Sequence, residues 1–513
     1  MGAPRRAVAR NVWLLLAISI VSVGVRLISI RQPFIDQWSW RQSDVAAIAR
    51  NYYEHGFHFG HPQIDWAGDA AGYVGTEFPV LPFAAALSYK LAGVQEWVGR
   101  IQAVLCFAAA LPFFFLLTRR LFGETTAIWA TFFYAFAPLG VVASRAFMPD
   151  IPSLSLAIIG LYFYVRWLDD QQAHDLLGAA LLISFALLIK LPTALIGAPI
   201  LYLTFAAVGR RGTGANDSPF GARRRTLEVL RATFRRPEIW IFGFVALVPS
   251  AIWYWHAYQI AQKYYPYHFF GAGGFRIESL GWYAKIAAQT ATVSLTPVLT
   301  LAAVVGLFVA PRGKYRRAFH WWLGVMLLFI VAAGWGNRHQ WYQLPLVPIA
   351  AVFGACACDW ASGRLRNRNA LRLTLAALLI VAFGASAFAY ARPYFVPTAT
   401  ELRELGLELK ATTPPDALVV AADEGDPTLL YYAERKGWHF PEKLGIFDGN
   451  PLDDAQLIAN LDRLRSHNAR YVVFYYGTRW WLDYYTGFAA HLAKVGAIKK
   501  DTPRARIYEL RTR

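Results

Sequence analysis

The chain has 513 residues, of which 56% are hydrophobic and 16% aromatic; its formal net charge is +18 and its mean hydropathy is +0.32. This composition excludes an ordinary soluble domain, because repeated apolar runs approach the roughly 20 residues that cross a bilayer as a helix. The charge argues against a nucleic-acid-binding protein, because the basic residues gather in alternate loops between the apolar runs.

The apolar runs predict a polytopic helical membrane protein with about eleven transmembrane helices. The error of this count is about one or two helices. The predicted spans lie near residues 12–30, 99–118, 124–143, 151–168, 174–190, 191–208, 239–256, 289–310, 320–336, 342–360 and 372–391. The first run has the basic flank of a signal peptide but no small-residue cleavage site after it, which indicates an uncleaved anchor.

The alternation of basic loops follows the positive-inside rule and predicts a cytoplasmic N-terminus. The 209–238 stretch is then a cytoplasmic loop carrying a short basic helix. The predicted outer face carries the 31–98 loop, the turn at Asp150, the end of the fifth span at Lys190, the 257–288 loop, the 336–341 turn and the C-terminal tail. Polar residues from distant parts of the sequence therefore converge on one face of a plasma membrane, and the arginine- and alanine-rich composition favours a bacterial inner membrane.

The 31–98 loop is too long and too patterned for a simple connector. Ser43 is expected to cap an amphipathic helix from Asp44 to about Glu54 that lies on the membrane. A second apolar segment, 80–91, is too short to span and is expected at the interface. Interface anchoring is the expected role of four tryptophans in or beside this loop, Trp38, Trp40, Trp66 and Trp97.

After Arg392 the composition becomes that of a soluble domain. Helical patterns at 399–411 and 453–466 alternate with strand-like runs at 417–420, 471–475 and 507–510, which predicts a small α/β domain on the outer face. The chain is therefore divided into a transmembrane domain, 1–392, and a soluble domain, 393–513. The acidic run 423–427 is interpreted as a solvated turn in preference to a calcium site.

Two acidic residues lie at the ends of hydrophobic spans that should share the outer face, Asp44 and Asp150. Two carboxylates at one interface can orient and deprotonate a hydroxyl group, which favours chemistry on a lipid-linked substrate. The simpler explanation is that each carboxylate complements the N-terminus of a helix, where acids are common.

Six sequence features follow one another between residues 10 and 360. They are Arg41-Gln42-Ser43-Asp44-Val45-Ala46-Ala47-Ile48-Ala49-Arg50, Thr76-Glu77-Phe78-Pro79, Arg100, Ser144-Arg145-Ala146-Phe147-Met148-Pro149-Asp150, Leu188-Ile189-Lys190-Leu191-Pro192 and Arg338-His339-Gln340-Trp341-Tyr342-Gln343-Leu344-Pro345. In this order they resemble the GT-C superfamily of polyprenyl-phosphate-dependent glycosyltransferases, especially its protein mannosyltransferase and aminoarabinose transferase branch, glycosyltransferase family 39.

The resemblance implies that residues 1–392 form a catalytic domain that transfers a sugar with inversion, from a polyprenyl-phosphate donor to a hydroxyl of a cell-envelope lipid, glycan or protein. The first-loop signature of the superfamily is an Asp-Glu pair, whereas this chain has Arg41 and Gln42 at those positions. Asp44 is the nearest acid and the expected base, Asp36 is the alternative, and Asp150 is the second catalytic acid.

The leaving group of such a reaction is a lipid phosphate, which cations at the outer interface would hold. Lys190 and Arg338 are the expected phosphate ligands, with His339 and Tyr342 in the same pocket, although a lysine at a helix end is ordinarily explained by snorkelling. Glu77 and His268 are candidate ligands for a divalent ion, but two scattered ligands are a poor metal signature. No other cofactor is predicted.

The rival class is a secondary transporter or lipid-carrier flippase, which would also be polytopic and basic. Transporters carry ionisable residues near the bilayer midplane, whereas the acids of this chain lie at span ends, which favours an enzyme. In a third hypothesis the spans only anchor the C-terminal domain, for which eleven are excessive. The predicted partners are a polyprenyl-phosphate-linked sugar, membrane lipids and a hydroxyl acceptor.

Overall fold

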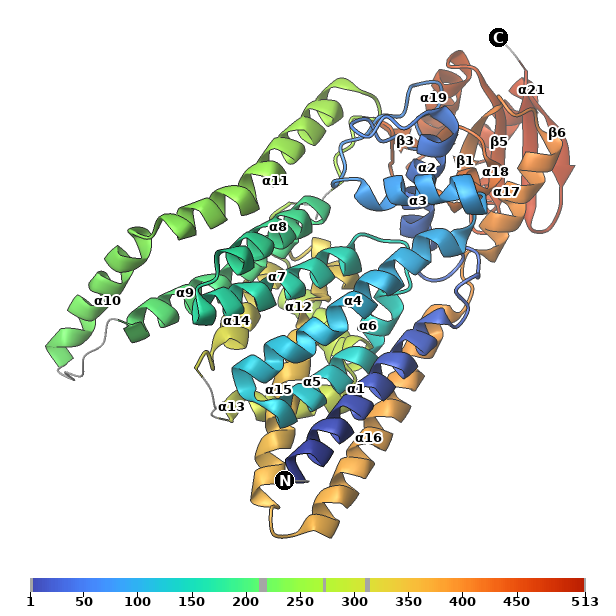
Figure 1. Cartoon of the computed structure of the whole chain (residues 1–513). Helices are drawn as coiled ribbons and strands as arrows, with labels where there is room; N and C mark the ends of the chain where they lie inside the picture. Colours follow the sequence, from blue (N-terminus) through green and yellow to red (C-terminus); the bar gives the residue numbers. More distant parts are fainter. Residues whose placement is uncertain (1–2, 212–218, 271–273, 310–313, 512–513) are drawn as a thin grey trace.

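The structure is a computed structural model that describes residues 3–211, 219–270, 274–309 and 314–511. Long helices form a bundle at one end of the molecule, and a domain that contains the β-sheet lies at the other end (Figure 1). The predicted fold class, a polytopic helical membrane protein with a C-terminal α/β domain, is confirmed.

Every predicted span coincides with at least one helix of the bundle. The helices and short helical turns are α1 (Ala3–Leu27), α4 (Glu96–Phe122), α5 (Glu124–Phe136), α6 (Pro138–Ala143), α7 (Asp150–Asp170), α8 (Ala173–Ile189), η1 (Leu191–Ile196), α9 (Gly197–Arg211), α10 (Pro219–Phe234), α11 (Pro237–Lys263), α12 (Leu280–Gln289), η2 (Thr290–Ser294), α13 (Pro297–Phe308), α14 (Ala318–Ala332), η3 (Gly336–Arg338), η4 (Gln340–Gln343), α15 (Leu346–Arg364) and α16 (Asn369–Ala391).

Within the described ranges, six helices are long and apolar enough to cross a membrane, or seven if one bent pair counts as a span, and four more apolar helices are shorter. The number eleven therefore stays a prediction. Helix α10 is the helix expected in the 209–238 loop, of which residues 212–218 lie outside the described residues.

The span predicted at 289–310 is not a continuous helix, which corrects the prediction. The segment Leu280–Ser294 and helix α13 meet at 108°. Proline at position 297 has no N–H to donate into a preceding turn, so it starts a new helix, and the Thr296 hydroxyl accepts a hydrogen bond from the Leu299 N–H as its cap. Pro138 starts α6 in the same way and divides the span predicted at 124–143.

The bundle has its core along α4, α5, α7 and α15, where long runs of side chains are buried. Helices α11 and α16 lie at the rim and expose apolar side chains, among them Trp240 at 61% and Leu373 at 65%. A helix that presents apolar side chains outward is suited to contact with lipid. The rim of the bundle is therefore its membrane-facing surface.

The 31–98 loop differs from the prediction. Helix α2 (Ser39–His55) begins five residues before Asp44, and the Ser43 hydroxyl bonds to Thr428 of the C-terminal domain instead of capping a helix. Helix α2 does not lie on the membrane, because nearly all of it is buried, next to α3 (Val80–Ala92) and α18 (Thr428–Ala433). Trp38 and Trp66 are buried as well, each 6% exposed, so neither anchors the chain at an interface.

The C-terminal domain is built on a five-stranded sheet in the order β2-β1-β5-β7-β6. Strand β1 pairs in parallel with β2 and β5, and β7 pairs antiparallel with β5 and β6. Its elements are α17 (Thr400–Thr412), β1 (Leu418–Ala422), α18, β2 (Gly437–His439), the pair β3 (Glu442–Lys443) and β4 (Ile446–Phe447), α19 (Asp454–Ser466), β5 (Ala469–Tyr475), α20 (Trp481–Tyr484), α21 (Thr486–Val495), β6 (Gly496–Asp501) and β7 (Ala505–Leu510). The two predicted helices and three predicted strands are confirmed.

Two apolar layers cover the sheet. Helices α19 and α21 pack on one face through Leu461 and Phe488, and α17 and α18 pack on the other through Leu405 and Leu429. The α17 and α18 layer shares its core with the 31–98 loop, including Ile48. The boundary near residue 392 stays a prediction, but the C-terminal domain packs directly on the loop that carries Asp44 (Figure 1).

Candidate active site

Five charged side chains of alternating sign meet where the bundle joins the 31–98 loop. The Arg41 guanidinium lies 3.7 Å from the Asp44 carboxylate and 3.0 Å from Glu77. The Lys190 ammonium lies 3.7 Å from Glu77 and 3.0 Å from Asp150. Two of the three predicted catalytic acids, one predicted phosphate ligand and one predicted metal ligand therefore belong to a single cluster.

Four parts of the chain build this cluster. Arg41 and Asp44 are three residues apart on α2, so they share one face of that helix. Asp150 is the first residue of α7, and Lys190 directly follows α8. The loop segment with Glu77 is held in place by a hydrogen bond from the Phe78 N–H to the Leu188 carbonyl, 3.1 Å. Helices α7 and α8 are antiparallel neighbours, so the start of α7 lies beside the end of α8. This packing brings Asp150 next to Lys190.

Glu77 is a fixed anion. Burial by itself would raise the pKa of its carboxyl, but Arg41 and Lys190 outweigh burial and hold the pKa at about 2. Its carboxylate also accepts a hydrogen bond from the Thr76 hydroxyl at 2.8 Å. A carboxylate with so low a proton affinity does not act as a base at neutral pH.

The residues suggested for a divalent ion fit one poorly. Glu77 already balances two cations, and His268 packs against Trp66 and Phe270. Among the residues described, no group of three or more His, Cys, Asp or Glu side chains is arranged to hold a metal. The metal hypothesis stays a prediction.

Asp44 has the environment of a base. Its carboxylate is buried and accepts a hydrogen bond from the Trp66 indole N–H at 2.9 Å. Burial raises the pKa of the Asp44 carboxyl, and Arg41 and the Trp66 hydrogen bond offset only part of that effect. A carboxylate with a raised pKa is a stronger proton acceptor than an exposed one.

The C-terminal domain reaches Asp44 through Trp66. The His439 ring packs against the Trp66 ring at 5.3 Å, and its Nδ1 lies 2.8 Å from the Asp423 carboxylate. Burial would lower the pKa of His439, but Asp423 outweighs burial and raises it. The interpretation of 423–427 as a solvated turn is wrong for Asp423, whose carboxylate is buried beside His439. Asp426 is half-buried, and its carboxylate accepts a hydrogen bond from the Ser39 hydroxyl of α2.

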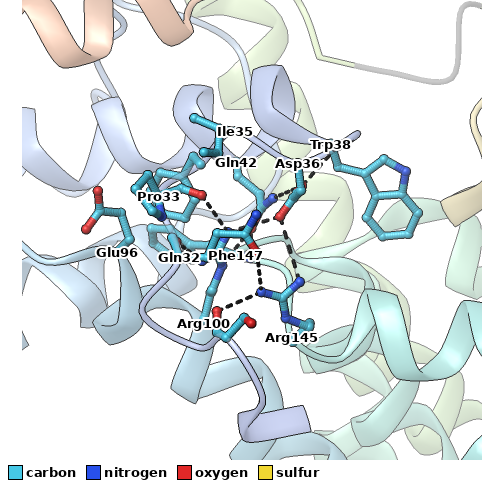
Figure 2. A network of polar contacts seen from close by, with 12 residues as sticks. Gln32, Pro33, Ile35, Asp36, Trp38, Gln42, Glu96, Arg100, Arg145 and Phe147 are labelled. Atoms are coloured by element: carbon cyan, nitrogen blue, oxygen red, sulfur yellow. Dashed lines mark hydrogen bonds and ion pairs between the residues drawn. The ribbon is translucent and has the colours of Figure 1, made fainter. Parts of the chain in front are cut away.

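Asp36, the alternative base, lies in a separate network (Figure 2). Its carboxylate lies 3.1 Å from Arg100 and 3.9 Å from Arg145, and it accepts hydrogen bonds from the Gln42 amide and the Trp38 N–H. The Arg100 guanidinium also donates to backbone carbonyls of the segment 30–33. This network ties the first loop to α4 and to the turn before α7.

The predicted phosphate ligands divide into two groups. Lys190 and Tyr342 line a cavity of about 30 Å³ beside Asp150, with the ammonium 4.9 Å from the Tyr342 ring. In the described part of the chain, the second carboxylate oxygen of Asp150, Oδ2, is buried without a hydrogen-bond partner. This small cavity offers one cation, one phenol and one free acceptor.

Arg338 and His339 line a different cavity of about 490 Å³ that lies against the loop 423–426. Arg338 is exposed and packs over Trp335 at 4.4 Å. His339 stacks on Trp341 at 4.5 Å, and burial together with Arg338 lowers its pKa to about 3. The lowered pKa favours the neutral His339 ring, which can still donate one hydrogen bond to a phosphate, so its role stays a prediction.

Comparison with known proteins bears on this arrangement. Residues 76–221 match the model of the family described as dolichyl-phosphate-mannose-protein mannosyltransferase. ArnT from Cupriavidus metallidurans, in its structure bound to undecaprenyl phosphate, superposes with a TM-score of 0.61 at 16% identity and covers 97% of both chains. The chain has the GT-C fold. None of the curated proteins matches it in sequence.

A second solved structure with this fold is the archaeal oligosaccharyltransferase AglB from Archaeoglobus fulgidus, in complex with an inhibitory peptide and a dolichol-phosphate. It superposes with a TM-score of 0.62 at 13% identity, over 98% of this chain and 74% of AglB. The resemblance to the GT-C superfamily that the motifs indicated is confirmed.

Within this GT-C fold, three residues of the candidate active site were not predicted from the sequence to act there: Trp66, His439 and Arg41. Trp66 and His439 carried no chemical signal, since a lone tryptophan in a loop is more often an interface anchor. Arg41 was noted only as a departure from the superfamily signature, yet it lies at the centre of the charge cluster. Its three-residue spacing from Asp44 on a helix was the one signal that would have paired them.

Proposed function

We propose that the chain is an inverting glycosyltransferase that moves a sugar from a polyprenyl-phosphate donor to a hydroxyl acceptor at the outer face of a bacterial inner membrane. The observation that carries this proposal is the buried carboxylate of Asp44, with its raised pKa, beside the cations Arg41 and Lys190 at one end of the bundle. ArnT bound to undecaprenyl phosphate and AglB bound to a dolichol-phosphate support the class of donor.

In this proposal Asp44 accepts the proton of the acceptor hydroxyl as its oxygen attacks the anomeric carbon. The bond from that carbon to the phosphate oxygen breaks, and its electron pair leaves with the polyprenyl phosphate. One displacement inverts the anomeric centre and requires no enzyme nucleophile. Burial supports the role, because a carboxylate poorly solvated by water gains more from taking up a proton.

Lys190 stabilises the leaving phosphate. Its ammonium has three donors, of which one faces Asp150 and another faces Glu77. Asp150 and Glu77 orient the lysine, and the Tyr342 hydroxyl is a further donor in the same small cavity. Arg41, bonded to Glu77 through both carboxylate oxygens, supplies the second positive charge.

Trp66 and His439 act as positioning residues for the base. The indole N–H fixes one oxygen of Asp44, so the other oxygen is directed toward Arg41 and the acceptor. The His439 ring, itself held by Asp423, packs on the indole and restricts its orientation. By this arrangement the C-terminal domain completes the active site.

The transporter hypothesis explains the structure less well. Ionisable groups of transporters concentrate near the bilayer midplane between two related halves of the bundle. Here the cluster joins helix ends to the 31–98 loop, and the C-terminal domain packs on that loop. A site at the end of the bundle, beside a separate domain, is suited to an acceptor that approaches from outside the membrane.

The direct test is sugar transfer by purified protein in liposomes, supplied with a panel of radiolabelled polyprenyl-phosphate sugars and an extract of envelope lipids, glycans and proteins. We expect one donor to give label in an acceptor fraction and an inverted anomeric configuration in the product. Movement of intact donor across the liposome membrane, without transfer from any donor, would instead establish the flippase.

Trp66→Phe tests the positioning role through a pH profile. Removing the indole N–H takes away a hydrogen bond that lowers the pKa of Asp44, so that pKa rises. Because the base must be deprotonated, the acid limb of kcat/KM moves to higher pH, and kcat falls by roughly tenfold as the oxygen loses its orientation. Trp97→Phe, at the start of α4, is the matched control and should leave the acid limb of the profile unshifted. If the acid limb of the kcat/KM profile is not shifted in Trp66→Phe, the positioning role of Trp66 is contradicted.

A further inference from the structure

A large groove lies at the end of the bundle away from the candidate active site. It has a volume of about 1290 Å³ and is bordered by the C-terminal end of α4, the start of α5, the end of α13 and the α15 and α16 hairpin. That volume exceeds the roughly 300–1,000 Å³ of a typical small-molecule pocket. In Figure 1 the hairpin lies at the opposite end of the molecule from the C-terminal domain.

The length of helix α15 gives the distance between the groove and the candidate active site. Tyr342, in the small cavity beside Asp150, lies just before α15, and Arg364 is its last residue. Nineteen helical residues extend over roughly 28 Å, close to the thickness of the hydrocarbon core of a bilayer. The groove and the active-site cluster therefore lie at opposite membrane surfaces, in different leaflets.

The mouth of the groove is basic. Three arginines line it, Arg364, Arg366 and Arg372, against one acidic residue, Asp359. Across the described residues, none of the three guanidinium groups forms an ion pair, and Arg364 packs over the Trp360 ring at 4.6 Å. Three cations without carboxylate partners at the rim of an apolar groove suit an anionic ligand.

The walls of the groove are apolar and open outward. Val304, Phe308 and Leu373 line it and are 50%, 82% and 65% exposed. Exposed aliphatic and aromatic side chains at bilayer depth contact hydrocarbon. The groove therefore combines a cationic rim at the membrane surface with a surface for acyl chains below it.

We propose that this groove binds an anionic glycerophospholipid of the leaflet opposite the active site, with its phosphate at Arg364, Arg366 and Arg372 and its acyl chains along α13 and α16. Basic pockets between transmembrane helices on the cytoplasmic side are suited to anionic headgroups, whose leaflet carries a negative surface potential. The basic loops on this side agree with that orientation. A bound lipid would hold α16, a rim helix, to α13 and α15.

Native mass spectrometry of the purified full chain tests the site, with phosphatidylglycerol and phosphatidylcholine of identical acyl chains as the two probes. The wild type should retain phosphatidylglycerol in preference to phosphatidylcholine. The variant R364Q/R366Q/R372Q should bind phosphatidylglycerol roughly a hundredfold more weakly, the effect that three arginines near a membrane surface contribute. The control R235Q/R316Q/R368Q removes three exposed arginines outside the groove and should bind as the wild type does.

A second variant separates a built site from surface charge. Ala376→Trp fills the apolar wall and keeps all three arginines, and it should also lose phosphatidylglycerol. Retention by Ala376→Trp, equal loss in the control triple variant, or equal binding of phosphatidylcholine would overturn the proposal. Preferential retention of undecaprenyl phosphate over phosphatidylglycerol would overturn the choice of ligand. Thermal unfolding of each variant shows whether it is folded before its lipid binding is compared.

Discussion

Asp44→Asn should abolish measurable sugar transfer while the protein stays folded. Asparagine has nearly the same volume and keeps an oxygen to accept the Trp66 indole hydrogen bond, so the packing around position 44 is preserved. It has no basic oxygen to take the acceptor proton. Loss of a general base lowers kcat by roughly 10²–10⁴-fold, and the measurement is single-turnover transfer in liposomes with the donor identified from the panel.

Asp69→Asn is the matched control for this experiment. Asp69 lies in the same outer loop, but its carboxylate is 42% exposed and pairs with His467 at the surface. We expect its kcat to equal that of the wild type. Transfer that survives in Asp44→Asn and disappears in Asp150→Asn would move the base to Asp150, whose Oδ2 has no partner among the described residues.

The positions of Asp150 and Lys190 show what the sequence determines well. Apolar runs fix where spans begin and end, and the alternation of basic loops fixes which ends share a face. A residue that begins one span and a residue that ends the next must then lie at the same surface. The structure places the two side chains 3.0 Å apart. Helix connectivity predicts the shared surface, and the packing of α7 against α8 sets the distance.

The sequence alone does not decide which of the two first-loop acids is the catalytic base. Asp36 and Asp44 are eight residues apart, and both precede or begin a predicted helix. What distinguishes them is the set of partners supplied from elsewhere: Arg100 and Arg145 for Asp36, and Trp66 for Asp44. No local pattern encodes pairings across 64 or 109 residues, because they depend on how whole helices pack.

The acidic run 423–427 illustrates a second limit. Asp, Gly and Pro in succession are typical of an exposed turn, and the local sequence gives no reason to bury it. The turn is covered because α2 packs on α18, which brings Ser39 to within 3.1 Å of Asp426. Burial raises the pKa of that carboxyl to about 6. The contact between the two parts of the chain, not the turn itself, determines its environment.

Asp36→Asn should reduce stability far more than catalysis. Arg100 and Arg145 are buried, 0% and 2% exposed, and Asp36 is the carboxylate that faces both. Removing one partner of a buried ion pair leaves uncompensated charge and costs about 3–5 kcal/mol. Asparagine keeps only one acceptor oxygen, so either the Gln42 amide or the Arg100 guanidinium would face an NH2 group where it now donates to a carboxylate oxygen. We expect a lower Tm in detergent and a smaller folded yield.

The folded fraction of Asp36→Asn separates a structural role from a catalytic one. If the Asp36 network only holds the first loop against α4, transfer per folded molecule stays close to that of the wild type, and adding Arg145→Met restores part of the Tm by removing one unpaired cation. Asp170→Asn, which loses an ion pair with Arg120 at a carboxylate 45% exposed, should cost at most about 1 kcal/mol. A stable Asp36→Asn protein without transfer would make Asp36 the base, because a structural carboxylate cannot be removed without loss of stability.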